Sequence, residues 1–299
     1  KKKNINVKKK NKKIIISWGL YKIIYMIRII KYLSEVKYYE KKDIETIRAT
    51  SAGSILSLLL ILNLDFNNIE NFVINKPWEK SFKITTESIL NAIYSKGLLN
   101  VDFIREIFAN HFKHKNLKMD LTMKELYEYS NIEFYVYAFN ISTFKGEIFD
   151  HKNFPDLKVL DAVYMSCSLP FVFEPMKYND SFYLDGGIEI EYPLNDTVKE
   201  CENTDEILSI CTKNLNNSEI TMTDDINIIN YGIYLFERLI AKHRIKDYKK
   251  IKNEIIIPSK AMNISDLKNL ISNKEERKRF MLDGEKFAMI FLEYIKGLN

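Results

Sequence analysis

The serine at position 51 stands in a setting that can turn its hydroxyl group into a nucleophile. Thr50-Ser51-Ala52-Gly53 follows the short run 44–49 and opens directly into the apolar stretch 54–62. This order predicts a strand, a tight turn and a helix, with small residues that permit a strained turn. The turn leaves Ser51 at a helix N-terminus, where N–H groups and the helix dipole stabilise negative charge. A plain helix N-cap is the alternative interpretation of such a serine.

A second segment supplies a carboxyl group that can act as a base. The strand-like run 182–184 ends in Asp185, and Gly186 and Gly187 follow it. An acid at a strand end is commonly a turn former, but flexible backbone also suits a general base. No strand-end or glycine-flanked context surrounds any of the histidines, which are His111, His114, His151 and His243. A Ser51–Asp185 dyad is therefore a more economical hypothesis than a Ser–His–Asp triad.

Several further segments, in the same order along the chain, resemble the patatin-like phospholipase family. Residues 161–175 are similar to that family's D-A-V-x-A-S-x-S-x-P-x-x-F-x-P block. Residues 137–143 are similar to its A-T-N-x-x-T strand, and residues 96–100 to its G-L-Y-D segment. Ala49 stands where the G-x-S-x-G pattern has its first glycine, and it is still small. Jointly these motifs are specific, and they cover roughly the first two thirds of the chain.

The resemblance implies an acyl hydrolase that acts on lipid esters and needs no cofactor or metal ion. Ser51 would attack the ester carbonyl, Asp185 would take its proton and later activate water, and an acyl-enzyme would lie between the two steps. Cleavage of the phospholipase A type is expected, on membrane phospholipid or another lipid ester. Small residues would support the elbow and the turn beside the base, namely Ala49, Gly53, Gly186 and Gly187.

The family's oxyanion loop is the element in which this chain departs most from the pattern. The loop sequence G-G-G-x-[KR]-G aligns without gaps with residues 18–23, so only Gly19 and Lys22 match. Gly19, Leu20 and Lys22 would form the loop here and offer backbone N–H groups to the oxyanion. Side chains stand where the family has glycine at Trp18, Leu20 and Ile23. These replacements favour an alternative function, a catalytically impaired pseudoenzyme that binds lipid or a protein partner.

Two other replacements bear on the site. Arg28 takes the place of a small residue of the first helix, and Glu191 takes the place of asparagine in the string D-G-G-x-x-x-N-x-P. If Glu191 faces Asp185, like-charge repulsion raises the pKa of Asp185; a surface position is the alternative. A group of aromatic residues either lines an acyl pocket or fills the core, and it comprises Phe171, Phe173, Tyr178 and Phe182.

Strands and helices alternate around these residues. Strands are expected at residues 14–17, 44–49, 133–140, 147–149 and 182–184, and helices at 21–36, from the elbow to 62, at 88–92, 101–112, 123–129 and from 160. This order predicts an α/β fold of three layers, with a mostly parallel central sheet flanked by helices on both faces. The site is expected at the carboxyl ends of the strands.

The length and the composition suit one large folded unit. The chain has 299 residues, of which 46% are hydrophobic, so it can bury a substantial core. It contains no Pro/Gly/Ser-rich linker. We expect a basic disordered arm at residues 1–13, a patatin-like hydrolase core at residues 14–210, and a mainly helical C-terminal extension at residues 211–299 packed on that core.

The net charge of +5 is concentrated at the start of the chain. Residues 1–13 contain eight lysines and no acid, and lysines recur at residues 242–252. Such an arm either remains solvated or attracts anionic lipid headgroups, at about 1 kcal/mol per lysine near the surface. No nucleic-acid partner is expected, because no recognisable nucleic-acid module accompanies the arm.

The apolar runs and the cysteines indicate in which cellular compartment the protein is expected. The longest apolar runs, near residues 23–30 and 55–64, are shorter than the roughly 20 residues that span a bilayer, and no signal peptide is evident. The three cysteines, Cys167, Cys201 and Cys211, have no metal-ligand spacing. We expect a cytoplasmic protein with peripheral contact at a membrane surface, no disulfide, and Cys167 buried near the site. The sequence predicts no oligomeric state.

Overall fold

The structure is a computed structural model that describes residues 11–19, 21–82, 85–214, 231–232, 234–235, 249–259 and 264–298. The strands are β1 (Lys13–Ile16), β2 (Thr46–Thr50), β3 (Glu133–Asn140), β4 (Lys145–Phe149), β5 (Met176–Tyr178), β6 (Ser181–Asp185), β7 (Ile207–Asn214) and β8 (Glu254–Ser259). The helices are α1 (Ile23–Glu35), α2 (Ala52–Ile61), α3 (Phe66–Asn75), α4 (Trp78–Ser81), α5 (Thr86–Ser95), α6 (Asp102–His114), α7 (Met123–Ser130), α8 (Val159–Cys167), α9 (Leu194–Lys199), α11 (Ile264–Ser272) and α12 (Lys274–Gly297).

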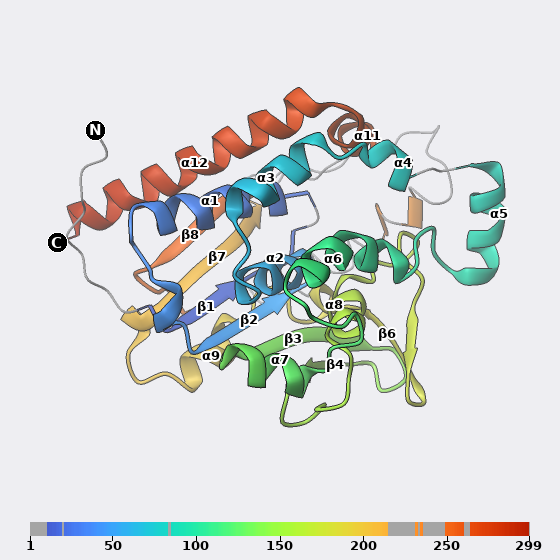
Figure 1. Ribbon diagram of the computed structural model, residues 1–299, viewed down its shortest axis with the longest axis horizontal. Coiled ribbons are helices and arrows are strands. Elements are labelled where there is room, and N and C mark those ends of the chain that lie inside the picture. The colour runs from blue at the N-terminus through green and yellow to red at the C-terminus, as the bar shows by residue number, and fades with distance from the viewer. Residues whose placement is uncertain are drawn as a thin grey trace.

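Within these ranges, eight strands form one mixed sheet (Figure 1). Its order is β5-β6-β3-β2-β1-β7-β8, and β4 pairs with β3. The strands β1, β2, β3, β7 and β8 are mutually parallel, whereas β4 and β6 run antiparallel to β3. The mostly parallel sheet predicted from the sequence is therefore confirmed.

The register along β3 explains how two distant segments meet. The β4 strand pairs with residues 136–140 along one edge of β3. On the other edge, β2 pairs with residues 133–137 and β6 with residues 138–140. The two strands share this edge end to end and run toward each other. Consequently the carboxyl end of β2, at Thr50, meets the carboxyl end of β6, at Asp185.

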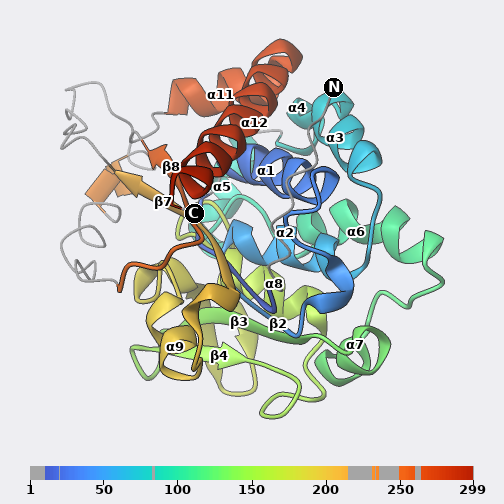
Figure 2. The same cartoon turned by 90° about the vertical axis from the view of Figure 1, so that its left-hand side faces the viewer.

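Helices bury the two faces of the sheet unequally (Figures 1 and 2). The larger core lies between one face and a layer that includes α1, α2, α6, α8 and α12. On the opposite face, Leu194 of α9 and Tyr192 pack over Ile15 and Ile207 in a smaller cluster. The β1 residues 14–16 are fully buried, because they supply side chains to both clusters. This arrangement confirms the predicted three-layer α/β fold.

The C-terminal segment contributes to the same body. The β7–β8 pair extends the sheet beyond residue 210, into the segment for which the sequence predicts a mainly helical extension. Helix α12 crosses α1 so closely that a Cβ on Gly284 would lie 2.5 Å from the carbonyl oxygen of Tyr25. Arg28 of α1 binds Glu70 of α3 and Glu285 of α12. The unusual arginine therefore joins three helices and does not reach the site.

Candidate active site

The elbow at Ser51 has the strained backbone that the sequence predicts. Ser51 lies between β2 and α2 with φ 55° and ψ −132°, a conformation that costs free energy for a residue other than glycine. Its side chain does not cap α2. The interpretation of Ser51 as a plain N-cap is therefore wrong, and the strain holds the hydroxyl group in another direction.

That direction is toward Asp185. The Ser51 Oγ donates a hydrogen bond of 2.5 Å to Asp185 Oδ2. The other carboxylate oxygen, Oδ1, accepts the N–H of Gly187 at 2.8 Å. Each carboxylate oxygen therefore accepts a different hydrogen bond, and Oδ2 accepts the one from Ser51. Ser51 and Asp185 are both 3% exposed, so the pair lies in a site shielded from water.

Burial raises the pKa of Asp185 to about 7, while the hydrogen bonds from Ser51 and Gly187 lower it. The burial effect dominates because a carboxylate loses its hydration in this site. A carboxyl group with a pKa near neutrality can both accept and return a proton at physiological pH. Glu191 is not among the causes of this pKa, which answers the question that its sequence position raised.

The Ser166 hydroxyl group on α8 and the backbone carbonyl of Ser168, the residue after the helix, hold Ser51 and Asp185 in place. Ser166 Oγ accepts the N–H of Ser51 at 2.8 Å and donates to the carbonyl of Tyr137 at 2.6 Å. The N–H of Asp185 donates to the carbonyl oxygen of Ser168 at 3.0 Å. Sequence reasoning assigned no role to these serines, although both belong to the S-x-S pair of the block at residues 161–175.

Two glycines allow backbones to approach each other at the site. A Cβ on Gly53 would lie 2.6 Å from the carbonyl oxygen of Ile16, so this glycine lets α2 pack against the end of β1. A Cβ on Gly186 would lie 2.1 Å from the carbonyl oxygen of Tyr137. Since Tyr137 stands where β2 gives way to β6 along β3, Gly186 permits that junction. Ala49 is fully buried on β2.

The loop predicted to hold an oxyanion lies beside the dyad, and Leu20 falls outside the described residues. Its first residue, Trp18, donates its indole N–H to the Glu191 carboxylate and its backbone N–H to the Glu191 carbonyl at 3.1 Å. The Lys22 ammonium group lies 5.6 Å from the centre of the indole ring. A Cβ on Gly187 would lie 3.6 Å from Trp18, which places the tryptophan against the turn that follows the base.

Two of the departures from the family pattern thus contact each other, since Glu191 binds Trp18. The segment that carries Glu191 is also tied to the elbow, because Thr50 Oγ1 donates to the carbonyl of Ile190 at 2.9 Å. A side-chain contact therefore holds this loop where the family sequence has glycines. No local sequence pattern joins Trp18 to Glu191, which lie 173 positions apart.

Other residues singled out in the sequence have different surroundings. Within the described residues, the side chains of Ser51 and Asp185 bond each other and the N–H of Gly187 and no histidine, and His243 lies outside those residues. Cys167 is buried with Sγ 3.7 Å from Ser54 Oγ, and burial raises the pKa of its thiol. Phe173 is buried, whereas Phe171 and Phe182 are 44% and 42% exposed, so the aromatic group does not line a single pocket.

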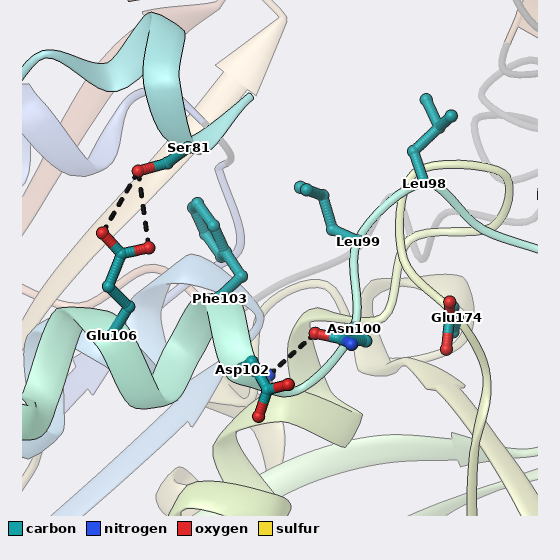
Figure 3. A pocket seen from close by; sticks show the side chains of 8 residues that line it. All are labelled: Ser81, Leu98, Leu99, Asn100, Asp102, Phe103, Glu106 and Glu174. Atoms are coloured by element: carbon teal, nitrogen blue, oxygen red, sulfur yellow. Dashed lines mark hydrogen bonds between the residues drawn. The ribbon is translucent and has the colours of Figure 1, made fainter. Parts of the chain in front are cut away.

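A cavity of about 430 Å³ opens near the segment at residues 96–100, and Figure 3 shows its lining. The lining side chains are Ser81, Leu98, Leu99, Asn100, Asp102, Phe103, Glu106 and Glu174. Neither Ser51 nor Asp185 is among them, so this cavity is separate from the candidate site. In the part of the chain that the structure describes, no group of three or more His, Cys, Asp or Glu side chains could hold a metal ion.

Comparison with known proteins gives consistent results. Residues 19–198 match the family described as Patatin-like phospholipase. "Probable lipid hydrolase 463L" of Invertebrate iridescent virus 6 is 26% identical over 190 residues, which is 63% of this chain and 63% of the viral protein. The match thus spans less than two thirds of that relative. "Uncharacterized protein R571" of Acanthamoeba polyphaga mimivirus is 21% identical over 279 residues, 92% of each chain.

Among solved structures, VipD from Legionella pneumophila is similar with a TM-score of 0.53 and 15% identity, over 95% of this chain and 67% of VipD. At that identity the likeness concerns the fold. The family match is stronger evidence, because it covers more than half of the chain and includes Ser51, the loop residues from Gly19 onward and Asp185. The chain belongs to the patatin-like phospholipase family.

Proposed function

We propose that this protein is a lipid acyl hydrolase that cleaves fatty acyl esters of membrane lipids, with Ser51 as nucleophile and Asp185 as base. The observation that carries the proposal is the 2.5 Å hydrogen bond from a strained, uncapped serine to a buried carboxylate. A structural serine at a helix start would cap the helix, whereas this one donates its hydrogen bond to the Asp185 carboxylate.

In the proposed reaction, Ser51 Oγ attacks the ester carbonyl carbon as its proton passes to Asp185 Oδ2. The carbonyl oxygen becomes an oxyanion, and the departing alcohol takes the proton back from Asp185. Water then attacks the acyl-enzyme, Asp185 takes its proton, and the fatty acid leaves while Ser51 regains its hydrogen. Atoms and charge balance over the two steps without a metal ion or cofactor.

The oxyanion would be met by backbone N–H groups from two directions. Ala52 begins α2, so its N–H has no carbonyl within the helix to bind. Gly19 offers the second N–H from the loop that Trp18 begins. Donors fixed before the reaction stabilise the charge strongly in a site that excludes water. Gly19 and Ala52 are therefore the proposed oxyanion donors, with Leu20 and Lys22 as the neighbouring loop residues.

The test is release of fatty acid from phospholipid vesicles, measured by mass spectrometry for the wild-type protein, Ser51→Ala and Asp185→Asn. We expect release by the wild type alone, and the position of the released chain then decides whether the enzyme is of the phospholipase A type. Absence of release by the wild type, with vesicle binding intact, would instead support the pseudoenzyme that binds lipid. Peripheral membrane contact and a reducing compartment, consistent with three free cysteines, belong to the same proposal.

A further inference from the structure

Large apolar side chains are exposed at the edge of the sheet where the parallel strands end. Ile93 and Tyr94 of α5 are 71% and 83% exposed, and Phe171, in the connection after α8, is 44% exposed. Beside the end of β3, Phe144 is 77% exposed and Phe182 is 42% exposed. Single exposed apolar residues are ordinary, but a group gathered at one edge indicates an interaction surface. We call these five side chains the apolar rim.

Hydrogen bonds tie the α5 part of the rim to the segment that follows α8. The N–H of Leu99 donates to the carbonyl of Val172 at 2.9 Å. A Cβ on Gly97 would lie 2.2 Å from the carbonyl carbon of Phe173, so the two backbones are in close contact. This contact places the segment that follows α5 beside the connection that carries Phe171. That connection continues from α8, whose Ser166 supports the elbow.

The other part of the rim belongs to the strands that form the site. Phe144 lies in the turn between β3 and β4, and its ring is 5.1 Å from that of Phe139. The N–H of Ile141, in the same turn, donates to the carbonyl of Phe182 at 2.9 Å. Phe182 lies on β6 three residues before Asp185. Both parts of the rim are therefore connected to the dyad through short, hydrogen-bonded segments.

An exposed lysine accompanies three of the rim residues. Lys96 Nζ donates to the carbonyl of Tyr94 at 3.2 Å. Lys177 is the cross-strand partner of Phe182, and Lys145 follows Phe144 in sequence. Aromatic side chains with lysines beside them suit the boundary between lipid headgroups and acyl chains. The lysines meet anionic headgroups while the apolar side chains enter below them.

Figure 1 places α5 beyond the arrowheads of β1 and β2, on the side where the elbow lies. Helix α12 also exposes large apolar residues, including Ile290 at 62% and Tyr294 at 58%. Its C-terminal half lies at the opposite end of the sheet in the same view, away from α5. The two helices thus offer an internal comparison between an apolar surface beside the site and one remote from it.

We propose that the apolar rim, with Lys96, Lys145 and Lys177, docks on an anionic lipid surface and presents the mouth of the site to it. The proposal rests on the proposed function, since a lipid surface is where a lipid ester would be found. It assigns the docking to this edge of the folded domain in addition to any contribution from the basic arm.

The test compares Ile93→Ser/Tyr94→Ser with Ile290→Ser/Tyr294→Ser in the full chain. Each protein is sedimented with vesicles of equal parts phosphatidylcholine and phosphatidylglycerol, and with vesicles of phosphatidylcholine alone. The first variant should bind the mixed vesicles about tenfold or more weakly, because binding strength scales with the apolar area buried. The second should bind as the wild type does. Raising the salt concentration should weaken wild-type binding to the anionic vesicles.

Hydrolysis of a short-chain ester dissolved in water separates this proposal from the proposed function. Ile93→Ser/Tyr94→Ser should keep the soluble activity and lose activity on vesicles. If neither the wild type nor the variants hydrolyse the dissolved ester or the vesicle lipid, the proposed function fails, while sedimentation still tests the rim. Equal vesicle binding by wild type and the α5 variant would overturn the docking proposal. So would a wild-type dimer, seen by analytical ultracentrifugation, that the α5 variant alone dissociates and that binds no vesicles, because a second copy would then cover the rim.

Discussion

Asp185 is held in the folded protein at a cost in stability. An aspartate in an unfolded chain has a pKa of about 3.9, whereas burial raises the pKa of Asp185 to about 7. Between these two values the folded state binds more protons than the unfolded state, so the stability that Asp185 contributes falls as pH rises. Below about pH 4 the carboxyl group is protonated in both states, so no charge is buried on folding. Above about pH 7 it is ionised in both states, and the full cost of burying the charge applies. The same burial suits the carboxyl group to its proposed role as a base at neutral pH.

Replacing Asp185 with asparagine should therefore stabilise the protein while abolishing its activity. The neutral amide avoids the cost of burying a charge, so we expect the free energy of unfolding at pH 8 to rise by a few kcal/mol. At pH 4 the difference from wild type should largely vanish, since the wild-type carboxyl group is then protonated. Denaturant unfolding at the two pH values measures this. A variant that is less stable than wild type at pH 8 would show that the carboxylate is well solvated or paired.

Glu191 acts, in our proposal, as a positioning residue for the loop that begins at Trp18. Glu191→Ala removes the acceptor of the Trp18 indole, so the Gly19 N–H is expected to move and kcat to fall by about 10- to 100-fold with little change in KM. Glu191→Gln keeps an acceptor oxygen and should recover most of the activity.

The matched control is Glu189→Ala, since Glu189 belongs to the same segment but binds the N–H of Gly146. Its kcat should stay close to that of wild type. If Glu191→Ala and Glu189→Ala behave alike, or if Glu191→Gln is as slow as Glu191→Ala, the loop does not depend on the Trp18 contact.

At the scale of elements, the sharing of one edge of β3 by β2 and β6 creates the site. The two strands approach from opposite directions, and their ends leave Ser51 and Asp185 facing each other. Helix α2 begins at the junction of β2 and β6, and there its backbone must pass close to the end of β1. Gly53 serves that purpose, because its helix passes the carbonyl oxygens of Ile16 and Ser17.

Gly53→Ala should accordingly destabilise the protein by about 1–3 kcal/mol, since a Cβ would lie 2.6 and 2.7 Å from two backbone oxygens. These oxygens belong to adjacent residues of the backbone and cannot move independently. Gly297→Ala is the matched control, because nothing lies within 4 Å of a Cβ there. Its effect should stay within about 0.5 kcal/mol. Thermal unfolding of both variants measures the difference, and equal melting temperatures would contradict the close packing of α2 against β1.

The elements around the site were the ones that could be predicted from the sequence. The strand expected at residues 133–140 is confirmed as β3, and the helix expected at residues 123–129 is confirmed as α7, which Thr122 and Glu125 cap reciprocally. These predictions succeeded because periodicity, caps and small-residue turns are local features of the sequence. The meeting of β2 and β6 depends on register along a third strand, which no local pattern encodes. The contact of Trp18 with Glu191 spans 173 positions and was missed for the same reason.

At the scale of the whole molecule, the fold extends beyond the region matched to the family. The match ends at residue 198, but β7 pairs with β1 and β8 extends the sheet further. Helix α12 covers α1 with side chains that are almost fully buried, including Phe291 and Ile295. The sequence did not predict β8, because the short run at residues 254–259 was included in a segment expected to be mainly helical. Among the described helices, none has the length and hydrophobicity needed to cross a bilayer.

Deletion of residues 274–299 should therefore abolish cooperative folding, because it would expose the apolar face of α1 to water. We expect the shortened chain to lose its near-ultraviolet circular dichroism and to bind a hydrophobic dye. Tyr294→Ser, at an exposed position of α12, is the control and should unfold as the wild type does. A shortened chain that retains one sharp thermal transition would show that α12 is a separate extension.

Ser51 is proposed to be a nucleophile that Asp185 activates. Covalent labelling with an alkyl fluorophosphonate, which reacts with activated serine hydroxyls, tests this proposal. Mass spectrometry should find a single adduct on the peptide that contains Ser51, and the labelling rate should rise with pH to half its maximum near pH 7, where Asp185 loses its proton. Ser51→Ala should not be labelled, and Asp185→Asn should be labelled far more slowly. An adduct on another residue, or equal labelling of Asp185→Asn and the wild type, would contradict the account.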